Sequence, residues 1–260
     1  MAAPKNTLKA ALARGEVQIG IWLALVSSAA AEIATEAGFD WALIDAEHAP
    51  NDVAAILDQL RALSGGKAAP VVRIPSGDPV WVNRVLDLGV QPVLVPMVDT
   101  PDEAAAIVAA TRYAPEGTRG NGAVLARATG YGATADYATT ANDEICVIVQ
   151  VESQRAIQNI DAIAGTRGVD CVFIGPADLA NDMGYPGRPT EPNVVATIDR
   201  ALERITASCK AAGIVTFDRN EFAPYIAKGV TFLGAGGDAL LLGQAMRDLA
   251  KGARAAAASD

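Results

Sequence analysis

Short apolar runs alternate with longer amphipathic stretches along the whole chain. Most of the runs are continuously apolar instead of alternating with polar residues, which is typical of strands covered on both faces. The eight runs that we predict to be strands are IGIWLAL (19–25), WALID (41–45), VVRI (71–74), PVLVPMV (92–98), ICVIVQV (145–151), CVFIG (171–175), GIVTF (213–217) and TFLGA (231–235).

The stretches between these runs have the spacing of amphipathic helices. Several begin at a capping residue and end at a glycine. These boundaries are Ser28, Asn51 and Thr100 at the starts, and Gly38, Gly89 and Gly213 at the ends. Eight strands that alternate with helices predict an α/β protein of the (β/α)8 TIM barrel type, with residues 1–260 as a single domain. An open doubly wound sheet is the alternative, but no GxGxxG motif follows the first strand.

One segment departs from this rhythm. Residues 114–144 are rich in Gly, Ala and Thr and show no clear period. A long insertion in a barrel is often a lid or a wall of the active site. We therefore expect this segment to border the site.

Composition narrows the possible partners. With 21 Lys and Arg against 30 Asp and Glu, the formal charge is −9, which argues against nucleic acid and against a polybasic membrane surface. No run approaches the roughly 18 apolar residues of a membrane span. The N-terminal stretch lacks the apolar centre of a signal peptide, so we expect a cytoplasmic protein. Cys146, Cys171 and Cys209 have no zinc spacing, and the first two are expected to be buried free thiols.

Ionisable and amide side chains follow several of the predicted strands. In a barrel, the carboxyl ends of the strands carry the chemistry. The residues at these ends are Asp45, Glu47 and His48 (the only histidine), Arg73, Gln150 and Glu152, and Asp178 in the GPADL stretch. Each alone has a structural explanation, such as helix capping or an ion pair. Together they place an imidazole, a guanidinium, an amide and several carboxylates at one mouth, which indicates a site.

The residue types favour metal-assisted carbon–carbon chemistry. Two separated carboxylates with a polar neighbour suit a hard divalent cation such as Mg²⁺ or Mn²⁺ and leave positions open for substrate. The helix start at GPADL offers backbone N–H groups to a substrate carboxylate. Arg73 is suited to hold an enolate oxygen, and His48 to move a proton.

Enzymes that cleave carbon–carbon bonds in this way, the aldolases, can use a Schiff-base lysine in place of a metal ion. The six lysines are Lys5, Lys9, Lys67, Lys210, Lys228 and Lys251. All fall in predicted helices, helix ends or the loop before the third strand. Because no lysine ends a strand, the metal-dependent route is favoured.

Several stretches resemble the class II, metal-dependent pyruvate aldolases of the 4-hydroxy-2-oxoheptanedioate and 2-keto-3-deoxy-L-rhamnonate type. The matching stretches span nearly the whole chain, and the blocks EHAP and GPADL are the most specific. They are GIWLALVSSAAAEIATEAGFDWALIDAEHAPND, PVVRIPSGDP, LVPMVDTPDEAAAIVAATRYAPEGTRG, VIVQVES and GVDCVFIGPADLANDMGYPG.

The resemblance implies a function and a set of site residues. The expected reaction is reversible cleavage of a 4-hydroxy-2-oxo acid to pyruvate and an aldehyde, with Mg²⁺, Mn²⁺ or Co²⁺ as cofactor. The implied metal ligands are Glu152 and Asp178. The implied substrate-binding residues are Trp22, Gln150, the backbone of Ala177 and Asp178, and Phe217. The implied catalytic residues are His48, Arg73, Asp45, which would organise the His48 loop, and Asp87, which a neighbouring subunit would contribute.

The resemblance also implies an assembly. Relatives form hexamers, as trimers of dimers, with the C-terminal helix exchanged between subunits. The stretch DALLLGQAMRDLAKGARAA after Gly237 has the apolar stripe that such an exchange needs. Phe217 departs from the family pattern, in which a small residue stands there. The aldehyde is therefore open, and hydroxypyruvate is an alternative donor to pyruvate.

Two other functions are compatible with parts of the sequence. GAGGD at 234–238 follows the eighth strand, where barrel isomerases often bind phosphate. A catalytically silent barrel that serves as a binding protein is the other alternative.

Overall fold

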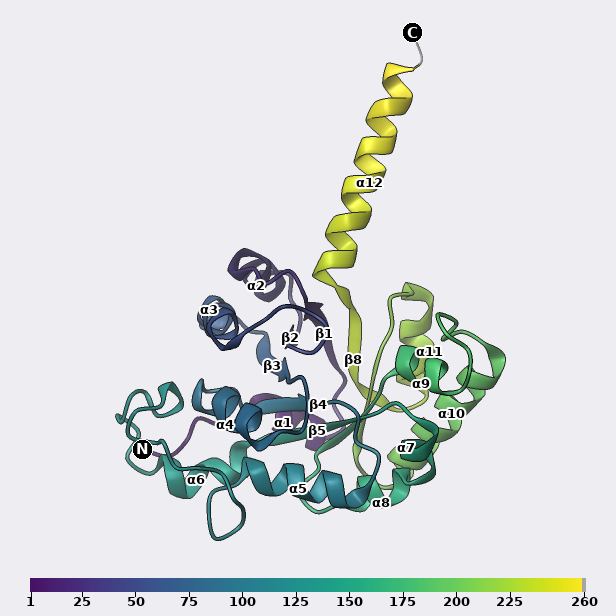
Figure 1. Cartoon of the computed structure of the whole chain (residues 1–260). Coiled ribbons are helices and arrows are strands. Elements are labelled where there is room, and N and C mark those ends of the chain that lie inside the picture. The colour runs from purple at the N-terminus through teal and green to yellow at the C-terminus, as the bar shows by residue number, and fades with distance from the viewer. Residues whose placement is uncertain (259–260) are drawn as a thin grey trace.

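Eight parallel strands form a closed barrel, with each strand paired to the next and β8 paired to β1 (Figure 1). The computed structural model describes residues 1–258. The strands are β1 (Gln18–Leu23), β2 (Trp41–Asp45), β3 (Ala69–Arg73), β4 (Pro92–Val95), β5 (Cys146–Val151), β6 (Cys171–Ile174), β7 (Ala211–Val215) and β8 (Val230–Gly237). The prediction of a TIM barrel is confirmed.

Helices lie between the strands and cover the outside of the barrel. The α-helices are α1 (Thr7–Ala13), α2 (Ser28–Glu36), α3 (Val53–Leu63), α4 (Pro79–Asp87), α5 (Pro101–Thr111), α6 (Tyr137–Glu144), α7 (Gln154–Gln158), α8 (Ile160–Gly165), α9 (Pro176–Asp182), α10 (Pro192–Ala207), α11 (Phe222–Ala227) and α12 (Asp238–Ala257). Two short 3-10 turns are η1 (Arg127–Thr129) and η2 (Arg219–Glu221).

The predicted helix boundaries are partly right. Thr100 caps α5 with a capping box, as the sequence predicts. The caps of α2 and α3 are instead Ser27 and Asp52, one residue away from the predicted positions. The prediction that a helix ends at Gly213 is wrong, because Gly213 lies inside β7. A Cβ atom there would come within 2.7 Å of the Phe173 ring, so this glycine serves packing inside the barrel.

Two hydrophobic cores result from this arrangement. The larger one lies between the strands and the surrounding helices. The smaller one fills the barrel interior with large rings, including Trp41 stacked on Phe232 at a centroid distance of 4.1 Å. The thiols of Cys146 and Cys171 are buried in this inner core, as expected, whereas Cys209 is exposed.

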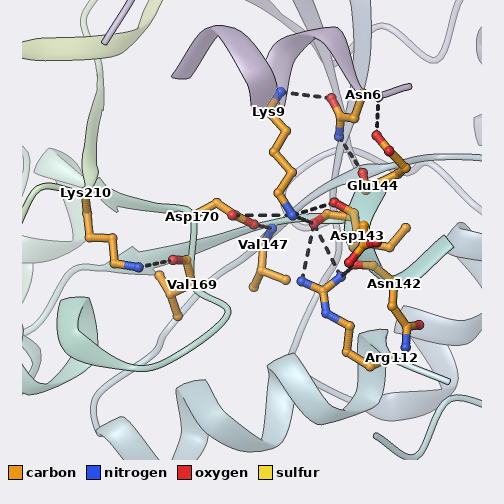
Figure 2. Close-up of polar contacts among 11 residues, drawn as sticks. Asn6, Lys9, Arg112, Asn142, Asp143, Glu144, Val147, Val169, Asp170 and Lys210 are labelled. Carbon is orange, nitrogen blue, oxygen red and sulfur yellow. Dashed lines mark hydrogen bonds and ion pairs between the residues drawn. The ribbon is translucent and has the colours of Figure 1, made fainter. Parts of the chain in front are cut away.

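Helix α1 closes the bottom of the barrel, at the amino ends of the strands. Its apolar residues Leu8 and Leu12 belong to the inner core. Figure 2 shows its polar side: Lys9 reaches the carbonyl oxygens of Asp143 and Ile145, at 2.9 and 2.8 Å, and Arg112 binds backbone carbonyls of the same segment. The N-terminal segment thereby seals the end of the barrel opposite the predicted site.

Within one chain, residues 114–144 do not line the active-site cavity, and the expected lid at the carboxyl ends of the strands is not seen. The segment follows α5 and precedes β5, which places it at the amino ends of the strands. Its last part is helix α6, whose Glu144 accepts hydrogen bonds from Lys5 and from the backbone N–H of Asn6. It packs on the N-terminal segment and on the end of α4 instead of forming a lid.

Helix α12 projects from the barrel and buries none of its residues (Figure 1). Its exposed apolar residues are Leu240, Leu241, Leu242, Met246 and Leu249. Within residues 1–258, no helix is long and apolar enough to cross a membrane.

Candidate active site

A cavity of about 340 Å³ opens at the carboxyl ends of the strands. Its walls include most of the side chains that the sequence singled out, because parallel strands converge there. The predicted site residues that line it are Trp22, Asp45, His48, Arg73, Gln150, Ala177, Asp178 and Phe217.

Arg73, the last residue of β3, is held by two carboxylates. Its Nε and Nη2 donate to the two oxygens of Asp45 at 2.8 and 2.6 Å, and its Nη1 lies 2.9 Å from Oε2 of Glu47. The register of β2 and β3 pairs Asp45 directly with Arg73. The guanidinium, with its carbon 5.8 Å from the centre of the Trp22 ring, is therefore fixed at the floor of the cavity.

The loop after β2 carries the only histidine. Asp45 Oδ1 accepts hydrogen bonds from the backbone N–H groups of Glu47 at 3.0 Å and His48 at 3.4 Å, so this carboxylate shapes the loop while it binds Arg73. The His48 side chain is 61% exposed, and its Nε2 lies 3.8 Å from Glu47. The imidazole thus stands at the rim, where another chain or a substrate can reach it.

Glu152 is a buried carboxylate just beyond β5. Its Oε1 accepts from the backbone N–H of Met97 at 2.8 Å, and its Oε2 accepts from the Gln150 amide. Burial, aided by the nearby charges of Glu47 and Asp178, raises the pKa of Glu152 to about 7 despite the lowering effect of these two hydrogen bonds. No positive side chain of the described residues forms an ion pair with it.

Glycine is needed next to this carboxylate. A Cβ atom on Gly175 would lie 2.4 Å from Glu152 Oε2, which is far closer than atoms can approach. The end of β6 therefore makes room for the position that the Glu152 side chain adopts.

The donor set fits a divalent cation. Burial raises the pKa of Glu47 as well, and the charges of Asp45 and Asp178 add to the effect against that of Arg73, because several carboxylates share this end of the barrel. Among the described residues, Gln150 Oε1 is buried without a hydrogen-bond partner. Two carboxylates and an amide oxygen are the ligands that Mg²⁺ and Mn²⁺ prefer. No group of three or more His, Cys, Asp and Glu arranged to hold a metal occurs within residues 1–258.

Of the remaining predicted residues, four line the cavity and one, Asp87, does not. Ala177 and Asp178 lie in the first turn of α9, where backbone N–H groups lack partners within the helix. Trp22 is buried near the end of β1, and Phe217 is exposed two residues beyond β7.

Asp87 is the last residue of α4, and its Oδ1 accepts from Arg119 at 2.9 Å. Because α4 starts near the carboxyl ends of the strands and runs back along the barrel by about 12 Å, Asp87 lies toward the end opposite His48. Within one chain the structure does not bring the two together.

Three features of the site were not given a role from sequence. Met97 adopts a φ of 57°, in which its backbone N–H meets Glu152. Glu47 contacts Arg73, and Asp238 lines the cavity while it accepts from the N–H of Ala24 at 2.8 Å. Glu47 was visible as a polar strand end, but no sequence signal marks a left-handed methionine.

The glycine-rich stretch after the eighth predicted strand does not form a separate loop. Gly234 and Gly237 belong to β8, and α12 begins directly afterwards at Asp238. The carboxylate of Asp238 occupies the backbone donors of Ala24 and Leu25, and its charge would repel an anion.

Comparison with known proteins agrees with this geometry. Residues 18–245 match the family described as HpcH/HpaI aldolase/citrate lyase. A hydroxypyruvate/pyruvate aldolase of Deinococcus radiodurans is 54% identical over 94% of this chain and 88% of its own length. A 4-hydroxy-2-oxo-heptane-1,7-dioate aldolase of Escherichia coli is 48% identical over 95% and 94%, respectively.

A solved structure shares the fold along the whole barrel. The crystal structure of a family protein from Burkholderia cenocepacia superposes with a TM-score of 0.92 at 39% identity, covering 96% of this chain and 100% of that one. The chain therefore belongs to the HpcH/HpaI aldolase/citrate lyase family, as an enzyme of the aldolase type.

Proposed function

We propose that this enzyme is a divalent-metal-dependent aldolase that reversibly cleaves 4-hydroxy-2-oxo acids to pyruvate, or hydroxypyruvate, and an aldehyde. The observation that carries the proposal is the convergence of Arg73, His48, Gln150 and Asp178 on one cavity, with the buried carboxylate of Glu152 beside it. The activities named for the similar proteins of D. radiodurans and E. coli support it.

Glu152 and Asp178 are the proposed ligands of Mg²⁺, Mn²⁺ or Co²⁺, with Gln150 beside them. When bound, the cation supplies Lewis-acid polarisation of the 2-oxo group. The Glu152 carboxyl is raised in pKa and bears no partner cation, so a divalent ion would relieve its unfavourable burial. Asp178 is the second proposed ligand because it lines the cavity beside Glu152.

The retro-aldol step needs a proton removed from the 4-hydroxyl group and a place for negative charge. As the bond between C3 and C4 breaks, its electron pair becomes the enolate of the 2-oxo acid. Arg73 would stabilise the charge on the former ketone oxygen, because its guanidinium is fixed in advance by Asp45 and Glu47. His48 would take part in the proton transfer, and Asp87 of a second copy of the chain would hold its imidazole.

The other residues position the substrate. The backbone N–H groups of Ala177 and Asp178 are the proposed seat of the 2-oxo acid carboxylate. Trp22 and Phe217 would form walls of the cavity, the former against Arg73 and the latter on the side of the aldehyde.

We also propose a hexamer, a trimer of dimers, in which subunits exchange α12. The exposed apolar residues of that helix support an exchange. The single domain of residues 1–260 and the cytoplasmic location stay predictions, and residues 259–260 lie outside the part of the chain that the structure describes.

The test begins by stripping the protein of metal with a chelator. Pyruvate release from a 4-hydroxy-2-oxo acid is then measured with a coupled lactate dehydrogenase assay. We expect loss of turnover and its recovery on addition of Mg²⁺, Mn²⁺ or Co²⁺. The variant Glu152→Ala should bind the cation weakly in calorimetry and show no recovery. Turnover that is indifferent to the chelator would refute the metal-dependent mechanism.

A further inference from the structure

A second cavity, of about 510 Å³, lies beside the active-site cavity. The two share a partition made of Pro176, Ala177, Val215 and Phe217, which line both. We name the second cavity the side chamber. Its volume is within the range of pockets that hold small molecules, and it is larger than the site it adjoins.

The walls of the side chamber come from two connections of the barrel. One wall is the segment between α9 and α10, with Pro189, Thr190 and then Val195 on α10 itself. The second wall comes from the segment after β7 and from α11. Its residues are Thr216, Asp218, Glu221 and Tyr225. The partition and the first wall are largely apolar, which suits a carbon chain, and the second wall adds hydroxyl groups.

The charges in the side chamber are negative. Asp218 and Glu221 are its ionisable acids, and none of the described residues that line it is a lysine or an arginine. Glu221 accepts from the Thr216 hydroxyl, and Asp218 accepts from the backbone N–H of Asn220 at 2.9 Å. These hydrogen bonds leave both carboxylates without a neutralising cation in the chamber. A chain that ends in a carboxylate would be repelled there.

Tyr225 contributes a neutral group. Burial, with the charges of Glu221 and Asp199, raises the pKa of Tyr225 to about 12. The phenol therefore keeps its proton at any working pH and can donate a hydrogen bond to a hydroxyl group of a bound molecule.

We infer that the side chamber receives the distal chain of the aldehyde, and that the preferred aldehydes are uncharged, alkyl or hydroxylated, in contrast to aldehydes that end in a carboxylate. This inference rests on the proposed function and specifies its substrate class. The reacting carbonyl stays in the active-site cavity, while the chain passes the partition at Phe217. The chamber thus selects by length and by charge.

Selection by the length of the aldehyde's carbon chain is tested by filling the side chamber. The variant Val195→Trp places an indole in it, and Ala196→Trp, at the neighbouring exposed position, is the matched control. We expect kcat/KM for addition of pyruvate to hexanal to fall roughly tenfold or more in Val195→Trp, because several methylene groups lose their burial. The values for glycolaldehyde and the KM for pyruvate should stay unchanged in both variants.

Selection by the charge of the aldehyde is tested with two four-carbon aldehydes, butanal, which is uncharged, and succinic semialdehyde, which ends in a carboxylate. The wild-type protein should prefer butanal. Asp218→Asn keeps an oxygen that can accept from Asn220, removes the charge, and should raise kcat/KM for succinic semialdehyde roughly threefold with little effect on butanal. Asp182→Asn, which changes a carboxylate outside the chamber, is the control.

Several results would overturn the inference. They are a wild-type preference for succinic semialdehyde, an unchanged aldehyde profile in Val195→Trp, or an unchanged charge preference in Asp218→Asn. If Val195→Trp fails to fold, the charge test decides alone. Absence of aldol addition with every aldehyde, glycolaldehyde included, would instead reject the proposed function, so the two failures are distinguishable.

Discussion

Arg73 and Glu152 show two ways in which this protein holds a buried charge. Arg73 has three contacts from Asp45 and Glu47, so its position depends on ion pairs already present. Glu152 has only the Met97 N–H and the Gln150 amide, and its pKa rises to about 7. A buried carboxyl with a raised pKa and without an ion pair is typical of a functional site, because it does not stabilise the fold.

Gly175→Ala tests how the Glu152 carboxylate is placed. The new methyl group would lie 2.4 Å from Oε2, so the carboxylate must move. We expect the affinity for Mn²⁺, measured by calorimetry, to fall roughly ten- to a hundredfold, the usual size of an effect on a ligand's support. Activity should fall with it.

The control for this variant is Gly165→Ala. A Cβ atom at Gly165 would meet nothing within 4 Å, and its backbone has no positive φ. It should leave Mn²⁺ affinity unchanged. Equal affinity in Gly175→Ala and the wild type would remove Glu152 from the ligand set.

At the scale of elements, sequence pattern was most reliable where burial alone decides. All eight strands were predicted because most of them are covered on both faces and therefore give a nearly continuous apolar run. Polar strand ends such as Arg73 and Gln150 were found for the same reason, since they interrupt those runs. Gly213 was misassigned because a packing glycine in a strand and a helix-ending glycine look alike in one sequence.

Other features depend on contacts between distant segments. The sequence does not show that helix α1 closes the barrel, because this role depends on its contact with the barrel interior. The 114–144 segment was placed at the wrong end because its composition does not say which end of a helix it follows. Met97 supports Glu152 through its backbone, and the residue type carries no information on that role.

The contacts of Glu144 with the segment before α1 lead to a prediction about stability and pH. Burial favours the neutral form of Glu144, but the Lys5 side chain, the Asn6 N–H and the charge of Lys9 outweigh it, so its pKa lies below the ordinary value of 4.5. Because the folded pKa is depressed, Glu144 stabilises the fold above about pH 4.5. This contribution is lost as pH falls through the folded value.

Glu144→Gln should therefore lower the free energy of unfolding at pH 7 by roughly 1–3 kcal/mol in urea titrations. The difference from the wild type should shrink as the pH falls below 4.5. Glu203→Gln, on the exposed face of α10, is the control and should behave as the wild type. A difference that does not change with pH would show that the carboxylate charge has no part in anchoring α1.

At the scale of the whole molecule, α12 lacks a partner for its apolar side chains within the described residues of one chain. Leu242, Met246 and Leu249 recur at helical spacing and are all exposed. Replacing Leu242 and Met246 by Glu should reduce the molar mass in light scattering, if α12 is exchanged between subunits. The double variant Gln244→Glu and Lys251→Glu adds as many glutamates to the polar side and should keep the mass. An unchanged mass in the first variant would exclude this helix from the interface.

The position of Asp87 leads to a test of shared active sites. Because Asp87 and His48 lie toward opposite ends of one barrel, any catalytic pairing must join two copies of the chain. His48→Ala and Asp87→Asn should each release pyruvate at least roughly a hundredfold more slowly than the wild type, the usual contribution of general acid–base catalysis.

When the two variants are unfolded together and refolded as a mixture, some sites combine an intact His48 with an intact Asp87, and activity should return in part. The same treatment of His48→Ala alone is the control and should recover nothing. A mixture that stays as inactive as its components would show that Asp87 does not serve the His48 of a neighbouring subunit.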